Sequence, residues 1–231
     1  MPRSSAIIVA AGAGKRMQNS TPKQFLLLQG QSVLYHSLHC FNAAPSVSEI
    51  IIVVAQCYLD SAELQASIPS NLSKTIRLVV GGAHRQDSVF NGLKVVDAAS
   101  EIVIVHDAVR PFITPALVEE TIRQCARFDG AVAAIPATDT LKHVEDGLIS
   151  ATLDRSSIWQ VQTPQAFGKD ILLQAFQQAE EDNFYGTDEA GLVERIGAKV
   201  AVVMGDRRNI KITCPEDIPV AEVLIRDWQQ T

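Results

Sequence analysis

The apolar residues of this chain gather in short runs that are rich in Val and Ile and lack a regular polar alternation. Runs of this kind indicate strands that are buried on both faces of a sheet. Glycine, proline or polar residues bound each run, as expected where a strand gives way to a turn. We therefore predict strands at residues 5–10, 49–55, 76–80, 101–106, 130–135 and 199–204.

Between these runs, apolar residues recur at the spacing typical of amphipathic helices. Helices are predicted at residues 32–43, 58–67, 85–98, 114–128, 168–181, 188–196 and 215–229. Alternating strands and helices favour an α/β fold with a mostly parallel, Rossmann-like sheet and helices on both faces. In such folds the active site lies at the carboxyl ends of the strands. No internal repeat, low-complexity tract or linker divides the chain, so we expect residues 1–231 to form a single domain.

One segment departs from this alternation. Between Leu141 and Leu153, two short extended runs flank Asp146-Gly147, which is a favoured hairpin turn. An isolated hairpin is only marginally stable in water, so we expect residues 137–159 to form a protruding β-hairpin arm that packs against a second copy of the chain. The alternative is a hairpin that lies on its own sheet.

The composition is that of an ordinary soluble protein, with 47% hydrophobic and 20% charged residues among 231. Its net charge of −6 argues against nucleic acid or a membrane surface as a partner, so a local cluster of cations must hold any anionic ligand. The four cysteines lack metal-binding spacing, which indicates buried, reduced thiols and favours the cytoplasm. The apolar run near the N-terminus is too short for a signal peptide.

The first predicted strand leads into a turn of small residues, Ala-Ala-Gly-Ala-Gly at residues 10–14, and then into cations that include Lys23. Gly12 and Gly14 lack the Cβ atoms that would keep backbone N–H groups away from phosphate oxygens. A dinucleotide-binding fingerprint would need a small residue where Met17 stands, and the phosphate-loop pattern ending in Gly-Lys-Ser/Thr is also absent. The segment therefore predicts a triphosphate site of a different kind.

A second candidate site follows the fourth predicted strand. Asp107 at its carboxyl end is placed to bind Mg²⁺ between substrate phosphates, and Arg110 is placed to pair with a phosphate. The alternative is that these two residues cap the next helix or pair with each other. We interpret His106 as a hydrogen-bonded core histidine rather than a metal ligand.

A third candidate follows the strand at 76–80, where Gly81-Gly82 precedes a predicted helix. Paired glycines allow a planar base to lie against the backbone, and Ser88, about one helical turn further on, could reach the base or ribose. The alternative is an ordinary glycine turn followed by polar residues in the first helical turn. For Arg85 we favour that alternative.

Polar clusters also occur later in the chain, and each is a weak indication by itself. They are Thr138-Asp139-Thr140, Asp154-Arg155, Thr163-Pro164-Gln165, Thr187-Asp188-Glu189 and Asn209-Ile210-Lys211. Most of them, taken in order with the loop at residues 10–17, Pro22-Lys23-Gln24-Phe25 and the segment 106–111, resemble the 2-C-methyl-D-erythritol 4-phosphate cytidylyltransferase family of the non-mevalonate isoprenoid pathway. The resemblance spans nearly the whole chain.

This resemblance implies a nucleotidyltransferase domain that transfers a cytidylyl group from CTP to methylerythritol phosphate and releases pyrophosphate. It also implies a Mg²⁺-dependent homodimer with interlocking arms, in which Asp107 binds the metal. The implied catalytic residues are Arg16, Lys23 and Lys211. The implied CTP contacts are Ala10, Ala11, Gly12, Ala13, Gly14, Lys15, Gly82, Ser88, Ala108 and Thr163. The implied polyol phosphate contacts are Asp107, Arg110, Thr140, Thr187, Lys211 and, from the neighbouring subunit's arm, Arg155.

Two alternative functions remain at this point. A cytidylyltransferase for another polyol phosphate, such as ribitol 5-phosphate, would share the first loop and the segment 106–111, although Asp154-Arg155 before Trp159 favours the methylerythritol enzyme. A non-catalytic nucleotide-binding module would keep the fold, but the intact cations and Asp107 argue against it. Ala83 stands where some relatives carry Asp after the paired glycines, which leaves base selectivity open if that contact uses a side chain.

Overall fold

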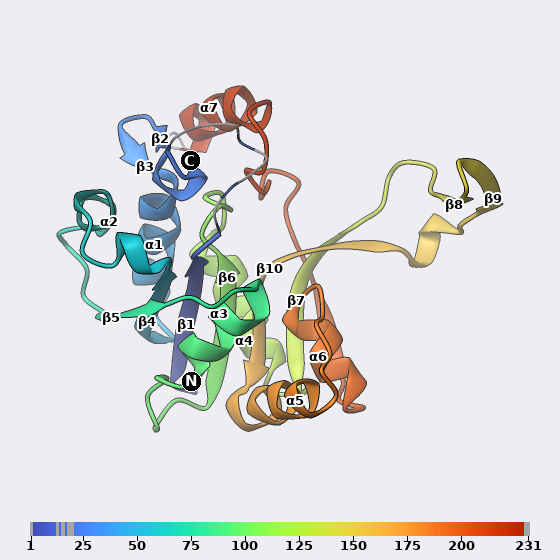
Figure 1. Ribbon diagram of the computed structural model, residues 1–231, viewed down its shortest axis with the longest axis horizontal. Helices are drawn as coiled ribbons and strands as arrows, with labels where there is room; N and C mark the ends of the chain where they lie inside the picture. The colour runs from blue at the N-terminus through green and yellow to red at the C-terminus, as the bar shows by residue number, and fades with distance from the viewer. Residues whose placement is uncertain (1, 13, 15–16, 18–20, 229–231) are drawn as a thin grey trace.

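The computed structural model describes residues 2–12, 14, 17 and 21–228 of the chain. Within this part, seven strands form a central sheet in the order β11-β7-β10-β6-β1-β4-β5 (Figure 1). They are β1 (Ser4–Ala10), β4 (Val47–Val54), β5 (Thr75–Val80), β6 (Ile102–Asp107), β7 (Gly130–Pro136), β10 (Trp159–Gly168) and β11 (Val200–Met204). All neighbouring strands run parallel except β10, which is antiparallel to β6 and β7. The predicted α/β fold with a mostly parallel sheet is confirmed.

Strand β10 was not predicted, because its sequence lacks an apolar run. Its first residues are exposed, and polar Gln162, Thr163 and Gln165 occupy its buried middle around Pro164. Proline is rare inside central strands. The register of β10 against β7 shifts between Val161 and Gln165, on either side of this proline. The strand is nevertheless central, since it joins the two halves of the sheet and delivers buried polar groups to its middle.

Helices cover both faces of the sheet, as predicted. One apolar core includes side chains of α1 (Val33–Ala43), α2 (Ala62–Ser67) and α4 (Pro115–Gln124), and the opposite core includes those of α3 (Arg85–Leu93), α5 (Lys169–Glu181) and α6 (Glu189–Arg195). Ile7 and Ile8 of β1 are fully buried in opposite cores, as expected for a strand covered on both faces. The last helix, α7 (Asp217–Trp228), packs in a third cluster with Leu28 and Phe112.

Several helices are shorter than predicted, and local hydrogen bonds explain the ends of two. Helix α2 begins at Ala62 because the hydroxyl of Ser61 accepts the backbone N–H of Leu64 at 3.1 Å. Helix α3 ends at Leu93, and shortly afterwards the carboxylate of Asp97 accepts the backbone N–H of Ala99 at 2.8 Å, which favours a turn there. Short elements complete the chain: η2 (Lys23–Phe25), β2 (Leu27–Leu28), β3 (Gln31–Ser32), η3 (Gln56–Tyr58) and η4 (Arg155–Ser157).

The segment predicted as an arm holds β8 (Lys142–Glu145) and β9 (Leu148–Thr152), which pair in an antiparallel hairpin. Asp146 and Gly147 form its turn with φ values of 50° and 80°, the left-handed geometry that favours this residue pair. Figure 1 shows the hairpin at the end of two extended segments, well away from the central sheet. Every residue of β8 and β9 is exposed, including Leu148 and Ile149. A role in dimerisation stays a prediction.

The four cysteines are unpaired. Cys40 is buried, which raises the pKa of its thiol, but Cys57 is exposed, so the prediction of buried thiols was wrong for that residue. Cys57 lies in η3, a short 3-10 helix in which no residue is buried. Among the helices that the structure describes, none is long and apolar enough to cross a bilayer.

Candidate active site

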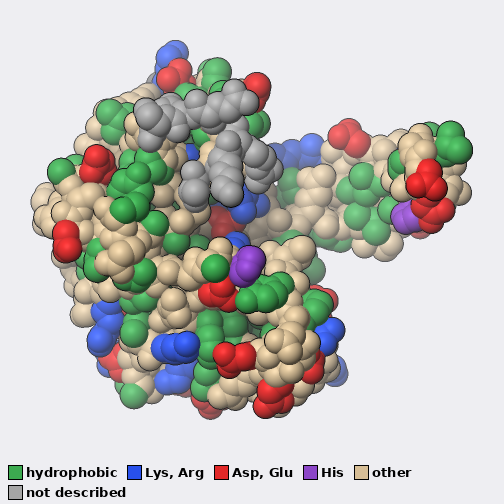
Figure 2. Space-filling view, in the orientation of Figure 1, with side chains coloured by type: hydrophobic (Ala, Val, Ile, Leu, Met, Phe, Trp, Pro, Cys, Tyr) green, Lys and Arg blue, Asp and Glu red, His purple; other side chains and the backbone are tan. Residues whose placement is uncertain are grey.

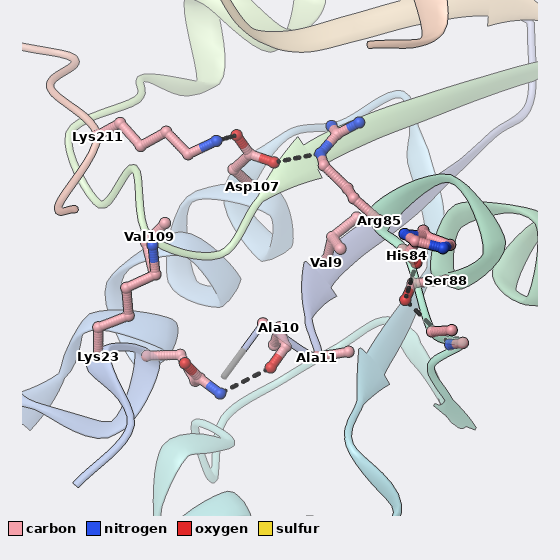
Figure 3. Close-up of a pocket in the computed structure, with 14 residues that line it drawn as sticks. Val9, Ala10, Ala11, Lys23, His84, Arg85, Ser88, Asp107, Val109 and Lys211 are labelled. Carbon is pink, nitrogen blue, oxygen red and sulfur yellow. Dashed lines mark hydrogen bonds and ion pairs between the residues drawn. The ribbon is translucent and has the colours of Figure 1, made fainter. Parts of the chain in front are cut away.

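A cavity of about 260 Å³ opens at the carboxyl ends of β1, β5 and β6. Residues of the loop after β1, the turn between β5 and α3, the end of β6 and the segment before α7 line it (Figure 3). Figure 2 shows a hollow in the globular body with acidic and basic side chains inside. The cavity is therefore charged rather than apolar, as a site for anionic substrates requires.

Most of the predicted loop and cation positions that the structure describes meet at this cavity. Its lining includes Ala10, Ala11, Gly12, Lys23, Gly82, Ser88, Asp107 and Lys211. Gly14 adopts a left-handed φ of 62°, and a Cβ there would lie 3.5 Å from the Lys23 side chain. Three predicted site residues, Ala13, Lys15 and Arg16, lie outside the described residues. Segments that lie far apart in the sequence thus meet at one cavity.

Asp107 is the only carboxylate among the described residues that line the cavity. The parallel register of β6 with β1 sets Asp107 beside Val9, directly before the small-residue turn. Its Oδ2 lies 2.6 Å from Nζ of Lys211, and its Oδ1 lies 3.0 Å from Nε of Arg85. Burial alone would raise the pKa of the Asp107 carboxyl, but these two cations outweigh burial and hold the pKa well below its ordinary value. Asp107 is therefore a fixed negative charge between two cations.

Arg85 lies in the first turn of α3, as the sequence analysis favoured, and its side chain also lines the cavity and pairs with Asp107. Besides Asp107, its guanidinium contacts Glu189, with Nη1 lying 2.7 Å from Oε1. Burial lowers the pKa of Arg85, but the two carboxylates outweigh it and raise the pKa above its usual value. Glu189 is almost fully buried, and burial raises its pKa. No local pattern could have revealed this bridge, because its three residues are more than twenty positions apart.

Thr163 lies behind Asp107 rather than in the cavity lining. Its hydroxyl oxygen accepts the backbone N–H of Asp107 at 3.1 Å and lies 2.9 Å from Nδ1 of His106. Burial lowers the pKa of His106 to about 3, so the ring is neutral and its Nε2 donates to the carbonyl of Arg110 at 3.2 Å. This arrangement confirms His106 as a satisfied core histidine and shows how β10 positions the end of β6.

In the turn between β5 and α3, the position of Gly82 leaves no room for a side chain. A Cβ on Gly82 would lie 2.3 Å from Cβ of Asp87. The Gly82 N–H donates to Oγ of Ser88 at 3.1 Å, and the Ser88 hydroxyl donates to the carbonyl of His84 at 3.0 Å. Ser88 thus holds the cavity wall in shape, and its contact with a base stays a prediction.

Arg110 and Ala108 lie next to the cavity without lining it. The Arg110 guanidinium donates to the carbonyl of Asn209 at 2.7 Å, and the Asn209 amide donates to the carbonyl of Thr163 at 2.9 Å. Two residues later, Lys211 enters the cavity, so this network fixes the segment that carries it. Ala108 is fully buried, and its N–H donates to the carbonyl of Val9 at 3.1 Å.

Three residues predicted to hold the polyol phosphate are exposed and outside the cavity lining. Thr140 lies between β7 and β8, and Arg155 in η4 donates to the carbonyl of Thr138 at 2.6 Å. Thr187 directly precedes Asp188, the N-cap residue of α6. Arg155 and Thr140 belong to the base of the hairpin arm, and neither lines the cavity of its own chain.

Comparison with known proteins places the chain in a family. A family model described as 2-C-methyl-D-erythritol 4-phosphate cytidylyltransferase matches residues 4–227. The curated protein of that name from Syntrophus aciditrophicus (strain SB) is 46% identical over 226 residues, which cover 97% of each chain. The one from Geotalea uraniireducens (strain Rf4) is 43% identical, again over 97% of both chains.

Solved structures agree with these sequence matches. The crystal structure of 4-diphosphocytidyl-2C-methyl-D-erythritol synthase from Anaerococcus prevotii superposes with a TM-score of 0.86 at 32% identity, and the match covers 97% of this chain and 99% of that one. The 2-C-methyl-D-erythritol 4-phosphate cytidylyltransferase of Thermus thermophilus gives a TM-score of 0.79 at 32% identity, with 98% and 100% covered. The chain therefore belongs to the 2-C-methyl-D-erythritol 4-phosphate cytidylyltransferase family.

Proposed function

We propose that this protein transfers the cytidylyl group of CTP to the phosphate of 2-C-methyl-D-erythritol 4-phosphate. An oxygen of the acceptor phosphate forms a bond to the α-phosphorus of CTP, and the bond from that phosphorus to the bridging β-phosphate oxygen breaks. The products are 4-diphosphocytidyl-2-C-methyl-D-erythritol and pyrophosphate. The convergence of Lys23, Lys211 and Asp107 on one cavity beside Gly12 and Gly82 is the observation that carries this proposal.

The chemistry needs charge stabilisation rather than proton transfer. The acceptor phosphate is anionic at neutral pH, so no general base is required, and neutral His106 lies behind the site. The main obstacle is the approach of two polyanions, followed by redistribution of negative charge in the transition state. Lys23 and Lys211 supply positive charge from two sides of the cavity, and Arg16 joins them in this proposal as an expectation from the sequence.

Mg²⁺ is the metal that the family implies, and the residues present fit it. Mg²⁺ is usually bound by one or two carboxylates together with substrate phosphates and water, so the single carboxylate of Asp107 is a suitable protein ligand. The described residues hold no cluster of three or more His, Cys, Asp or Glu side chains that would form an all-protein metal site. When bound, the metal would neutralise phosphate charge, while Lys211 and Arg85 keep the carboxylate ionised and oriented.

We further propose that the active form is a homodimer in the cytoplasm. The exposed apolar side chains of the arm, Val144, Leu148 and Ile149, support an interface between two copies of the chain. Arg155 and Thr140 at the base of the arm would then contact the acceptor phosphate bound to the neighbouring subunit. Thr187 and Arg110 would contact the acceptor from the same chain as the cavity.

The function is tested by following pyrophosphate release from CTP and Mg²⁺ with a panel of polyol phosphates. We expect rapid release with methylerythritol phosphate and slow release with ribitol 5-phosphate and erythritol 4-phosphate. Pyrophosphate release should be faster with CTP as the donor than with ATP, GTP or UTP. The same comparison measures whether Ala83 weakens base selectivity. Faster release with ribitol 5-phosphate, or none with any acceptor, would contradict the proposal.

A further inference from the structure

The first turn of α3 faces the segment of residues 184–189, which leads into α6. Three consecutive side chains of this turn contact that segment. The ring of His84 lies 4.5 Å from that of Tyr185, centroid to centroid, and Arg85 forms its ion pair with Glu189. Between them, Gln86 contacts the backbone of the same segment. His84 and Arg85 also line the cavity, so one short turn touches both regions.

Gln86 holds the backbone of the segment by two hydrogen bonds. Its Nε2 donates to the carbonyl of Phe184 at 3.0 Å, and its Oε1 accepts the N–H of Gly186 at 2.9 Å. An amide side chain is the right chemistry for this task, because it combines one donor and one acceptor in a fixed plane. A Cβ on Gly186 would lie 2.9 Å from Cδ2 of Leu192, so the segment is also pressed against α6 at this point.

The far side of the segment is fixed as well. Asp188 caps α6 through the backbone N–H of Gly191 at 3.0 Å, and its other carboxylate oxygen accepts from Nε2 of Gln165 at 2.9 Å. Thr187 therefore stands between Gly186, whose backbone N–H is held by Gln86, and Asp188, whose carboxylate is held by two partners, while Thr187 is itself exposed. Preorganised groups bind a ligand at a lower entropic cost than mobile ones, so these contacts favour binding by Thr187.

We propose that Gln86 is a positioning residue for the polyol phosphate, which fixes residues 184–187 so that Thr187 is presented beside the nucleotide cavity. Gln86 itself lies outside the cavity lining and touches neither CTP nor the reacting phosphates in this arrangement. The inference rests on the proposed function, because it assigns Thr187 to the acceptor. It predicts an effect on one substrate only, although α3 is the helix that follows the predicted cytosine-binding turn.

The test replaces Gln86 with Met, which keeps the length of the side chain and removes both hydrogen bonds. We expect KM for the polyol phosphate to rise by about tenfold, since two hydrogen bonds to the segment are lost. KM for CTP should change less than about twofold, because Ser88 and Gly82 keep their own contacts. Gln178→Met is the matched control, because Gln178 also donates a side-chain hydrogen bond, to Asp182 at 3.0 Å, on the surface of α5.

A second measurement does not depend on activity. Hydrogen–deuterium exchange of residues 184–188 without substrates should be faster in the Gln86→Met protein than in the wild type, and unchanged in the control. Equal exchange in all three proteins would overturn the inference, as would an equal rise in both KM values or an unchanged acceptor KM. A wild-type protein inactive with every acceptor would refute the proposed function instead, while the exchange result would still show whether Gln86 holds residues 184–188 in place.

Discussion

Replacing Asp107 with Asn is the most informative single change at the cavity. Asn keeps the shape of the side chain but removes the charge that Lys211 and Arg85 share. Neither cation is left without compensation when the Asp107 charge is removed. Arg85 retains its ion pair with Glu189, and the Lys211 side chain is 37% exposed, so water can solvate its ammonium group. The substitution therefore tests the charge at the cavity with limited damage to the fold.

The structure sets the size of the stability effect. Breaking a fully buried ion pair costs about 3–5 kcal/mol, but Glu189 beside Arg85 and water around Lys211 reduce this to about 2 kcal/mol. For a chain of this length, that loss lowers Tm by about 4–8 °C. Asp182→Asn is the matched control, because Asp182 pairs with Arg195 on the surface at 2.7 Å and should lower Tm much less than Asp107→Asn does. Scanning calorimetry measures both variants.

The pH dependence of this effect has a definite sign. The folded protein holds the pKa of Asp107 below its ordinary value, so the stabilisation is present above about pH 4 and is lost as the pH falls through the lower folded pKa. The Tm difference between the wild type and the Asp107→Asn protein should be constant from pH 7 to about pH 5 and shrink in more acidic solution. A difference that already disappears between pH 7 and pH 6 would refute this account of the carboxylate.

The catalytic readout is the Mg²⁺ dependence of turnover. Asp107→Asn removes a hard anionic ligand, so activity should fall most at low Mg²⁺ and recover partly as the metal concentration rises. Calorimetric titration of CTP with Mg²⁺ into each protein should show weaker binding by the variant than by the wild type. If both the titration and the Mg²⁺ profile match the wild type, Asp107 is not a metal ligand and serves only to anchor the two cations.

Three further substitutions test other parts of the site. Lys23→Met should lower kcat/KM at least about a hundredfold in steady-state assays, since a preorganised charge is worth about 3 kcal/mol in the transition state, and near-normal turnover would remove Lys23 from catalysis. Ser88→Ala should raise KM for CTP about fivefold by releasing Gly82 N–H, while an unchanged KM would show that the turn holds without it. Arg155→Ala should raise KM for the polyol phosphate far more than KM for CTP. Mixed Arg155→Ala and Lys23→Met dimers should regain partial activity, whereas no recovery in proven heterodimers would show that the arm serves its own chain.

The sequence predicts the sheet well where apolar runs record burial on both faces, as in β1, β4 and β6. It fails at β10, whose buried residues Gln162, Thr163 and Gln165 are polar. These side chains are satisfied by partners that other strands and loops deliver, such as Asp206 and Asp188. The spacing and hydrophobicity of residues in a sequence do not indicate such tertiary partners. A buried strand of polar residues therefore has the sequence pattern of a loop.

The same limit explains the site. Small residues at 10–12, cations and the strand-end Asp107 are local features, and the parallel topology brings them together at the cavity. Arg85 and Gln86 look like ordinary first-turn residues, because their partners Glu189 and Gly186 lie about a hundred positions away. The one sequence feature that could have indicated their role is their place after paired glycines in a parallel α/β fold. That feature does not identify the residues with which they interact.

Isotope transfer tests the central claim most directly. Methylerythritol phosphate labelled with ¹⁸O in its phosphate oxygens is incubated with CTP, Mg²⁺ and the wild-type protein, and the products are analysed by mass spectrometry. Direct attack on the α-phosphorus predicts that the diphosphocytidyl product retains all of the label and that the released pyrophosphate is unlabelled. Release of CMP with label in a pyrophosphorylated polyol, or no cytidylylated product, would contradict the account.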